Sequence, residues 1–301
     1  MLPRSRRTRT RRRARRRAAL ATLWLVCPVL LASAALADEP TVHPRMLWAR
    51  LRAPETGTAE AIGSYSNGCL IGAVRLPADG TGYQAVELQR NRHYGHPEAI
   101  AFVRRLGRRV SRADLGTVMV GDIAQPRGGP AWGHGSHQTG LDVDVWLGLD
   151  VAELPRRARR NLEHPSMLDA ATRRVDRAIW TDAHAELLRI AASDDGVDRV
   201  FIDAAIKRDL CDRSFDDRSW LRRLRPWPNH DDHMHVRLGC PDGSSDCVPQ
   251  SPPPTDEGCG PELDALIDPP PPTTPRPRRA RPPRPPLPDR CQPLLGPLLE
   301  R

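Results

Sequence analysis

Long apolar runs are scarce in this sequence of 301 residues. A membrane span needs about 20 consecutive apolar residues. Beyond residue 37 no segment approaches that length, and the one apolar stretch before it, 18–36, is interrupted by Pro28. We therefore expect no stable membrane span after residue 37, and a permanent anchor formed by 18–36 is the weaker alternative.

Net charge is also nearly absent outside the first 37 residues. The formal charge is +9, but residues 1–37 hold ten arginines and no acid, which leaves 36 basic residues against 37 acidic ones. Nucleic-acid binding depends on a strongly basic surface. A body this close to neutral argues against DNA or RNA as a partner.

The basic, apolar first segment has the pattern of an export signal. A basic region runs to Arg17, the apolar stretch follows, and Ala35-Leu36-Ala37 fits the small-x-small cleavage pattern. We expect residues 1–37 to be a cleaved signal peptide and the protein to be periplasmic. The many arginine pairs leave the export route open.

No Cys-x-x-Cys pair occurs, which argues against a zinc site made of thiolates. Six cysteines follow the signal, and an even number in an exported protein predicts disulfides. Spacing alone leaves 15 possible connectivities. The six are Cys69, Cys211, Cys240, Cys247, Cys259 and Cys291.

Secondary-structure patterns alternate between short strands and helices, without an internal repeat. Pro97 suits the first turn of a helix, and apolar residues at 100, 103, 106 and 110 continue it. Asp79-Gly80 predicts a hairpin. The segment 153–176 is helical or irregular. Strands are expected at 116–123, 141–147, 199–202 and 235–238, and further helices at 183–192 and 204–210.

The composition changes near the C-terminus. Residues 269–288 are dominated by proline and arginine, which favours an extended polyproline II segment without a core. Such a segment is a surface tail, a spacer or a wall-binding arm. Cys291 beyond it suggests that the tail is tied back by a disulfide.

Five of the ten histidines lie in two clusters, and each cluster runs into a predicted strand. Because side chains alternate along a strand, Asp142 and Asp144 share one face, and His233 and His235 share a face of the second strand. The polar faces converge if the two strands are neighbours. Isolated histidines are usually structural, which we apply to His43, His93, His96, His164 and His184.

Zinc suits this set of side chains. Catalytic zinc commonly takes three ligands from histidine and carboxylate, with a water in the fourth place. His137 precedes the first strand, Asp144 lies within it, and His235 comes from the second strand. No HExxH motif supplies a glutamate base. His233 is the best candidate general base, since it leaves its strand on the same face as His235, and His230 is a candidate proton donor or oxyanion donor.

The chain resembles the penicillin-insensitive murein endopeptidases, which are periplasmic metallopeptidases. The resemblance covers residues 60–300 and rests on the motifs IGSYSNGCLIGA, YGHP, GHGSHQTGLDVDVWL, RPWPNHDDHMHVRLGCP and GCG. The wider group includes lysostaphin-type peptidases, D-Ala-D-Ala metallopeptidases and the hedgehog signalling domain. The resemblance implies an α+β fold with a central antiparallel sheet that carries the zinc site, flanked by helices and held by disulfides.

The resemblance also implies roles for individual residues. His137, Asp144 and His235 are the expected zinc ligands, and His134 lies near the metal. His233 and His230 match further active-site histidines. One zinc ion is expected, because Arg173 and Arg174 stand where a second site needs an acid and an imidazole. The implied disulfides are Cys69–Cys291, Cys211–Cys259 and Cys240–Cys247.

The implied reaction is hydrolysis of D-alanyl–meso-diaminopimelyl cross-bridges in peptidoglycan, and penicillin has no serine nucleophile to acylate. The alternatives are a D,D-carboxypeptidase and a non-catalytic peptidoglycan-binding protein. Two roles are open for Asp142: it orients a ligand imidazole, or it forms a simple salt bridge. For Arg127 and Gln138 the two alternatives are binding of stem-peptide carboxylates or amides and a purely structural role. The expected organisation is a metallopeptidase domain at 38–265, an extended segment at 266–290 and a disulfide-tied tail at 291–301.

Overall fold

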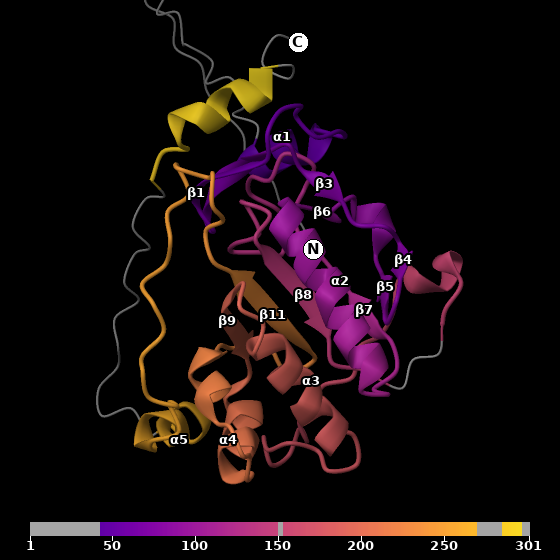
Figure 1. Ribbon diagram of the computed structural model, residues 1–301, viewed down its shortest axis with the longest axis vertical. Helices are drawn as coiled ribbons and strands as arrows, with labels where there is room; N and C mark the ends of the chain where they lie inside the picture. The colour runs from indigo at the N-terminus through magenta and orange to yellow at the C-terminus, as the bar shows by residue number, and fades with distance from the viewer. Residues whose placement is uncertain (1–42, 150–152, 270–284, 297–301) are drawn as a thin grey trace, which may run out of the picture. The chain divides into compact units, whose positions relative to one another are not determined.

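A seven-stranded sheet forms the centre of the protein in the computed structural model (Figure 1). The structure describes residues 43–149, 153–269 and 285–296, which belong to one compact unit. In order across the sheet, the strands are β10 (Leu224–Pro226), β9 (Val197–Ile202), β11 (His233–Leu238), β8 (Asp142–Trp146), β7 (Val118–Val120), β5 (Tyr83–Ala85) and β4 (Asp79–Gly80).

The middle of the sheet is antiparallel. β11 pairs antiparallel with both β8 and β9, and β8 pairs antiparallel with β7. The flanking pairs β9–β10 and β5–β7 are parallel. The predicted α+β class with a central antiparallel sheet is confirmed, and parallel pairs extend that sheet on either side.

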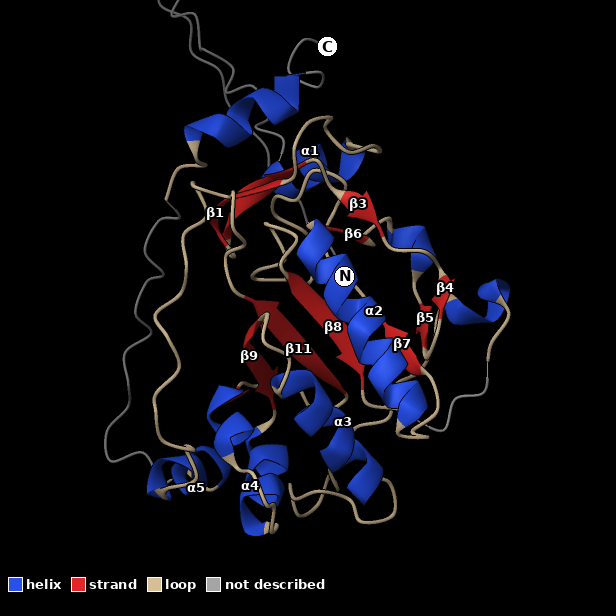
Figure 2. Cartoon of the chain, viewed as in Figure 1, coloured by secondary structure: helices blue, strands red, loops and turns tan. Residues whose placement is uncertain are grey.

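The helices α2 (Pro97–Arg112) and α3 (Asp182–Ala192) cover one face of this sheet (Figure 2). Ile100, Val103, Leu106 and Val110 of α2 share one core with the apolar residues of β8 and β11. Burial of these side chains holds the layers together at about 25 cal/mol per Å² of apolar surface removed from water. The opposite faces of β8 and β11 are left for polar side chains.

Local capping sets where the helices begin. His96 is the N-cap of α2 and accepts a hydrogen bond from the Glu98 amide, and Pro97 occupies the first turn as predicted. Thr181 and His184 form a capping box at the start of α3. Asp203 caps α4 (Ala204–Asp212) by accepting from the amide of Ala205. Side-chain acceptors at these positions satisfy amides that have no partner within the helix.

Two of the sequence expectations differ in detail. The predicted strand 116–123 is shorter, because only Val118–Val120 joins the sheet. The hairpin at Asp79-Gly80 exists, but those two residues form β4 and the turn falls on Thr81 and Gly82. Gly82 has φ +69°, and a side chain there would meet the carbonyl of Gly107 in α2. Segment 153–176 contains one short helix, η2 (Arg156–Arg159), and is otherwise irregular.

Smaller elements surround the sheet. The strands β1 (Glu60–Ser64) and β2 (Asn67–Ile71) form a hairpin, and β3 (Val74–Arg75) pairs with β6 (Tyr94–Gly95). The remaining helices are α1 (Pro44–Arg50), η1 (Leu88–Arg90), η3 (Ser219–Arg223), α5 (Pro261–Ile267) and η4 (Asp289–Leu295).

All three disulfides implied by the family resemblance are present. Cys69–Cys291 joins β2 to η4, Cys211–Cys259 joins α4 to the segment before α5, and Cys240–Cys247 closes a short loop after β11. The first of these links residues 222 positions apart. The C-terminal segment is therefore tied back to the domain, as expected.

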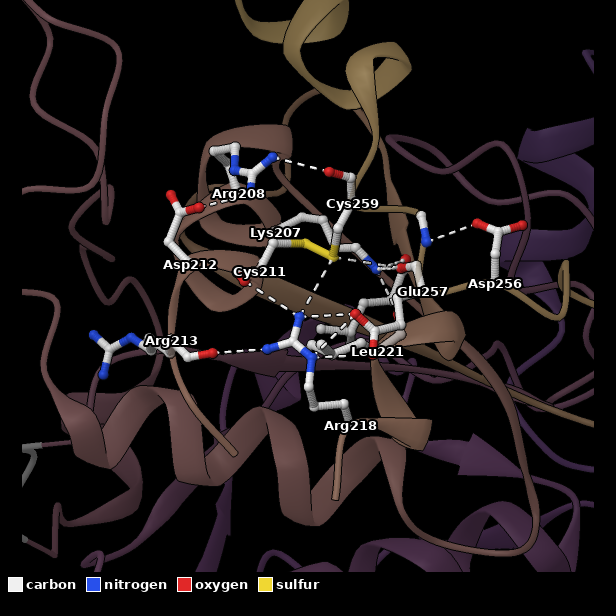
Figure 3. The surroundings of a disulfide bond; sticks show 12 residues. Lys207, Arg208, Cys211, Asp212, Arg213, Arg218, Leu221, Asp256, Glu257 and Cys259 are labelled. Carbon is white, nitrogen blue, oxygen red and sulfur yellow. Dashed lines mark hydrogen bonds and ion pairs between the residues drawn. A yellow bond between two sulfur atoms is a disulfide. The ribbon is translucent and has the colours of Figure 1, made fainter. Parts of the chain in front are cut away.

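Beside the Cys211–Cys259 disulfide lies Lys207, the only lysine of the sequence (Figure 3). Its side chain is fully buried, and its ammonium group donates to the carbonyls of Leu221, Leu224 and Glu257. Three donors thus meet three backbone acceptors, which offsets the cost of burying the charge. This contact and the disulfide both fasten the segment before α5 to α4.

The predicted signal peptide and most of the proline-rich segment lie outside the described residues. Within the described part, each helix is too short or too polar to cross a membrane.

Candidate metal centre

The register of two neighbouring strands creates the site. β8 and β11 pair so that His235 stands opposite Asp144 and Arg237 stands opposite Asp142. Because both strands alternate strictly, these four side chains lie on the sheet face away from α2 and α3. The predicted convergence of the two polar faces is confirmed.

His137 reaches the same place from the loop before β8. Its backbone has φ +65°, an unusual conformation for a non-glycine residue. The backbone amide of His137 donates to Asp142 Oδ2 at 2.9 Å, and its Nδ1–H donates to the carbonyl of Ile123 at 2.7 Å. These two bonds fix the ring so that Nε2 faces Asp144 Oδ1 at 3.2 Å.

His235 turns Nδ1, and not Nε2, toward Asp144. Its Nε2 is 2.9 Å from Asp142 Oδ1, so Nδ1 is left to face Asp144 Oδ1 at 3.6 Å. Burial lowers the pKa of His235 to about 4, although Asp142 opposes the shift. The ring is therefore neutral near pH 7, which is the form that binds a metal ion.

Two buried atoms at the centre of this cluster lack a hydrogen-bond partner: His137 Nε2 and Asp144 Oδ1. Burial lowers the pKa of His137, but the Asp144 charge outweighs it and raises that pKa to about 9. The Asp144 carboxylate is therefore stabilised by a positive charge beside it, which is either a proton on His137 or a metal cation. Orphaned buried polar atoms are rare in folded proteins, and a cation between these two satisfies both. The residues present fit a metal ion.

His134 offers a competing ligand. Its Nδ1 lies 3.8 Å from Asp144 Oδ2, and ligand atoms of His134, His137 and Asp144 all lie within 4.8 Å of one another. Its Nε2 is bound to Asp122 Oδ2 at 2.8 Å. His137 and Asp144 are thus common to two sets, and either His235 or His134 completes a set of three.

Asp142 is fully buried beneath the cluster and plays both of the roles considered for it. It accepts from His137 and His235, and its Oδ1 also accepts from Arg237 Nε at 2.8 Å. Burial raises the pKa of Asp142, but Arg237 and His235 outweigh it and hold that pKa well below its ordinary value. Asp142 therefore stays charged, and it fixes the His235 ring and the backbone of His137 while it pairs with Arg237.

The two histidines expected to take part in catalysis stand beside the cluster. Nδ1 of His233 is 2.5 Å from Asp232 Oδ1, and its Nε2 lies 3.9 Å from Asp144 Oδ1. Burial lowers the pKa of His233, but Asp232 and Asp144 outweigh it and raise the pKa above its ordinary value. Nδ1 of His230 donates to the carbonyl of Pro228, and its ring lies 4.8 Å from the His233 ring.

Asp144, His134, His230, His233 and His235 border one open cavity of about 490 Å³, whereas His137 and Asp142 lie behind its lining. Arg127 and Gln138 are outside its lining. Arg127 binds the carbonyls of Ala53 and Leu294, and Gln138 binds the backbone of the β1–β2 hairpin. These contacts are structural, which agrees with the structural alternative for both residues. The lining consists of Ser66, Gly133, His134, Gly135, Ser136, Asp144, Phe201, Trp227, Pro228, Asn229, His230, His233, His235, Arg237 and Gln250.

Two carboxylates of the site were not singled out from the sequence. Asp122 follows β7 and binds His134, while Asp232 precedes β11 and binds His233. Their position in the sequence could have indicated them, because each lies at the end of a strand that neighbours β8. Among the isolated histidines, His96 and His184 are caps as expected, but His164 stacks on Trp146 with ring centroids 3.3 Å apart. Trp146 in turn lies 5.2 Å from His233.

Comparison with known proteins agrees with this geometry. The sequence model of the family described as penicillin-insensitive murein endopeptidase matches residues 61–296. A protein of that name from Haemophilus influenzae is 46% identical over 233 residues, which cover 75% of this chain and 81% of that protein. The Klebsiella pneumoniae protein of the same name is 43% identical over 270 residues, covering 88% and 96%.

A third relative, from Escherichia coli, carries the same name and is 42% identical over 271 residues, covering 89% of this chain and 94% of the relative. The residues that the family model matches include the whole candidate metal cluster and the cysteines of all three disulfides. The chain belongs to the family of the penicillin-insensitive murein endopeptidases.

Proposed function

We propose that this protein is a zinc-dependent murein endopeptidase that hydrolyses D-alanyl–meso-diaminopimelyl cross-bridges. One observation carries the proposal: in a family of peptidases, His137 Nε2 and Asp144 Oδ1 are buried, lack a hydrogen-bond partner, and face each other at 3.2 Å. A pair of unpaired ligand atoms at the edge of an open cavity, which Asp144 borders, is suited to a catalytic cation.

His137, Asp144 and His235 hold the one expected zinc ion in this proposal. We favour His235 over His134 because His235 Nδ1 faces the same oxygen of Asp144, Oδ1, as His137 Nε2 does, and because one buried carboxylate, Asp142, holds both of these residues. His134 lies at the edge of the site and is held by Asp122. A bound zinc ion lowers the pKa of water towards 7 and polarises the scissile carbonyl.

His233 is the proposed general base. Asp232 accepts from Nδ1–H of His233, so Nε2 of the same ring carries the lone pair that faces the cavity. That nitrogen takes a proton from the attacking water and passes it to the leaving amine. His230 is the proposed donor to the oxygen of the scissile carbonyl, and its ring borders the same cavity. Because Nδ1–H of His230 is taken by the carbonyl of Pro228, Nε2 can donate only when the ring is in its imidazolium form.

The substrate is peptidoglycan, which lies outside the cytoplasm. The export signal proposed for residues 1–37 delivers the enzyme to the periplasm, where disulfides form. The proposal also includes the division of the exported chain into a metallopeptidase domain at 38–265, an extended segment at 266–290 and a tail at 291–301.

The test uses purified cross-linked muropeptide dimers and mass spectrometry of the products. We expect monomeric peptides from the zinc-loaded enzyme and none after chelation, with activity restored by added zinc. Release of free D-alanine without cleavage of the cross-bridge would identify a D,D-carboxypeptidase instead. Binding to sacculi with no cleavage by the zinc-loaded protein would contradict any peptidase activity.

A further inference from the structure

A group of exposed arginines lies outside the active-site cavity, although the body of the chain is close to neutral. Three shallow hollows carry them on the surface formed by β3, β4, η1, η2 and the outer side of α2. We call this region the arginine surface, and its arginines are Arg75, Arg104, Arg108, Arg156, Arg157 and Arg160.

The three hollows form one continuous surface. Leu88 and Arg156 line both the hollow of Arg157 and Arg160 and the hollow of Arg75. Pro77 lines both the hollow of Arg75 and the hollow on α2. Their arginines therefore act on a ligand together rather than at separate points.

The short helix η2 holds part of this surface in place. Arg159 is its one buried arginine, and its guanidinium donates to the carbonyls of Leu154 and Ala78 and to Asp79. With Arg159 anchored inside, Arg157 and Arg160 are turned outward and exposed. The exposed charges are thus presented by a fixed backbone.

Little in the surface neutralises these charges. Asp79 is the only carboxylate in the lining of the hollows, and it already pairs with Arg156 and Arg159. Within the described part of the chain, no carboxylate pairs with Arg75, Arg157 or Arg160. Guanidinium groups bind carboxylates in a bidentate manner, so unpaired ones favour an anionic ligand.

The arginine surface begins at the edge of the active site. Leu88 and Gln89 of η1 line its hollows, and the next residue, Arg90, lies 3.6 Å from Asp122 Oδ2. Asp122 binds His134, which borders the active-site cavity. A ligand that extends out of the active site past η1 therefore comes first to the hollow lined by Arg156, Arg157 and Arg160. Arg104 and Arg108 lie beyond it on α2, which covers the other face of the sheet.

We infer that the arginine surface binds free carboxylates of the stem peptides that adjoin the cross-bridge being cleaved. This inference rests on the proposed function. The polymer carries many peptides with free carboxylates, whereas an isolated dimer carries only its own. Continuity with the active site favours the same polymer over an anionic membrane as the partner.

The test compares Arg157→Gln/Arg160→Gln with the control Arg52→Gln/Arg222→Gln, which removes two positive charges elsewhere. Both are assayed for co-sedimentation with intact sacculi and for cleavage of isolated muropeptide dimers. We expect the first variant to bind sacculi about tenfold more weakly than the control at low salt. The difference should shrink at about 0.5 M salt, and dimer cleavage should be equal.

Equal binding of both variants to sacculi would overturn the inference, even if the dimers are cleaved. Loss of binding to vesicles of anionic phospholipid, with sacculus binding intact, would also overturn it and indicate a membrane surface. If the wild-type protein fails to cleave the dimers, the proposed function fails, and the sedimentation assay still decides whether the arginines bind the polymer.

Discussion

Four histidine rings place a nitrogen within 4 Å of the Asp144 carboxylate: His137 at 3.2 Å, His235 at 3.6 Å, His134 at 3.8 Å and His233 at 3.9 Å. Two of them come from the loop before β8 and two from β11. The carboxylate is buried, so its charge is stabilised by these rings rather than by water. At the residue scale, Asp144 is the centre on which the site depends.

Replacing His233 by alanine tests the proposed base. Its side chain lies beside the cluster, so His233→Ala should retain zinc while kcat falls by about 10²- to 10⁴-fold. Zinc content by elemental analysis and dimer cleavage by chromatography measure the two effects. His137→Ala is the comparison, since it should lose both zinc and activity. Full activity of a zinc-loaded His233→Ala protein would remove His233 from the mechanism.

Asp142→Asn tests the residue beneath the cluster. An amide cannot accept from the His137 amide, the His235 ring and Arg237 together, so the His235 ring and the backbone of His137 lose their fixed positions. The Kd for zinc should rise by about 10- to 100-fold, measured by competition with a fluorescent chelator.

The matched control for that experiment is Asp122→Asn, which affects the carboxylate that holds His134. Its Kd for zinc should stay close to the wild-type value if His235, and not His134, completes the ligand set. A larger loss of affinity in Asp122→Asn than in Asp142→Asn would favour His134.

At the scale of elements, strand alternation was enough to predict which side chains of β8 and β11 share a face, whereas the pairing of the two strands came from the structure. Period-2 patterns fix faces, and the two polar faces differ sharply from the apolar ones. The loop residue His137 was harder to place, since its positive φ and its bonds to Ile123 and Asp142 depend on contacts distant in sequence. The contact of His164 with Trp146 was missed for the same reason.

The disulfides should differ in their contribution to stability. Cys69–Cys291 closes a loop with a sequence separation of 222, against 7 for Cys240–Cys247. Loop-closure entropy predicts about 5 kcal/mol for the first and about 2 kcal/mol for the second. Urea unfolding of Cys69→Ala/Cys291→Ala and Cys240→Ala/Cys247→Ala measures both losses. An equal or smaller loss in the first variant would contradict the entropic argument.

Lys207 makes stability depend on pH. Burial and the nearby Arg225 lower the pKa of Lys207 to about 7 from an ordinary 10.5, although Glu257 and Asp256 oppose the shift. Between these values the unfolded chain binds more protons than the folded one, so the free energy of unfolding should rise with pH through this window. The total change is on the order of a few kcal/mol.

Lys207→Met provides the comparison for this pH effect. The variant leaves the carbonyls of Leu221, Leu224 and Glu257 without their donor and is expected to be less stable. Its urea unfolding curves should lack the part of the pH dependence that Lys207 contributes between pH 7 and 10.5. Parallel pH profiles for the two proteins would show that the lysine does not titrate in this window.

At the scale of the whole molecule, net charge and charge distribution give different information. The near-neutral sum beyond residue 37 argued against nucleic acid, yet it could not reveal the arginine surface. Its arginines come from β3, α2 and η2, which are far apart in the chain, and only the fold brings them together. The disulfide pattern and the fold class followed from the resemblance, whereas spacing alone left the pairing open.

The central claim is that His137, Asp144 and His235 hold one zinc ion. Anomalous X-ray scattering at the zinc edge, from crystals of the zinc-loaded protein, tests it most directly. The account predicts a single peak about 2.0–2.2 Å from His137 Nε2, an Asp144 carboxylate oxygen and His235 Nδ1. A peak bound by His134 with His235 out of reach, or no peak in this cavity, would contradict it.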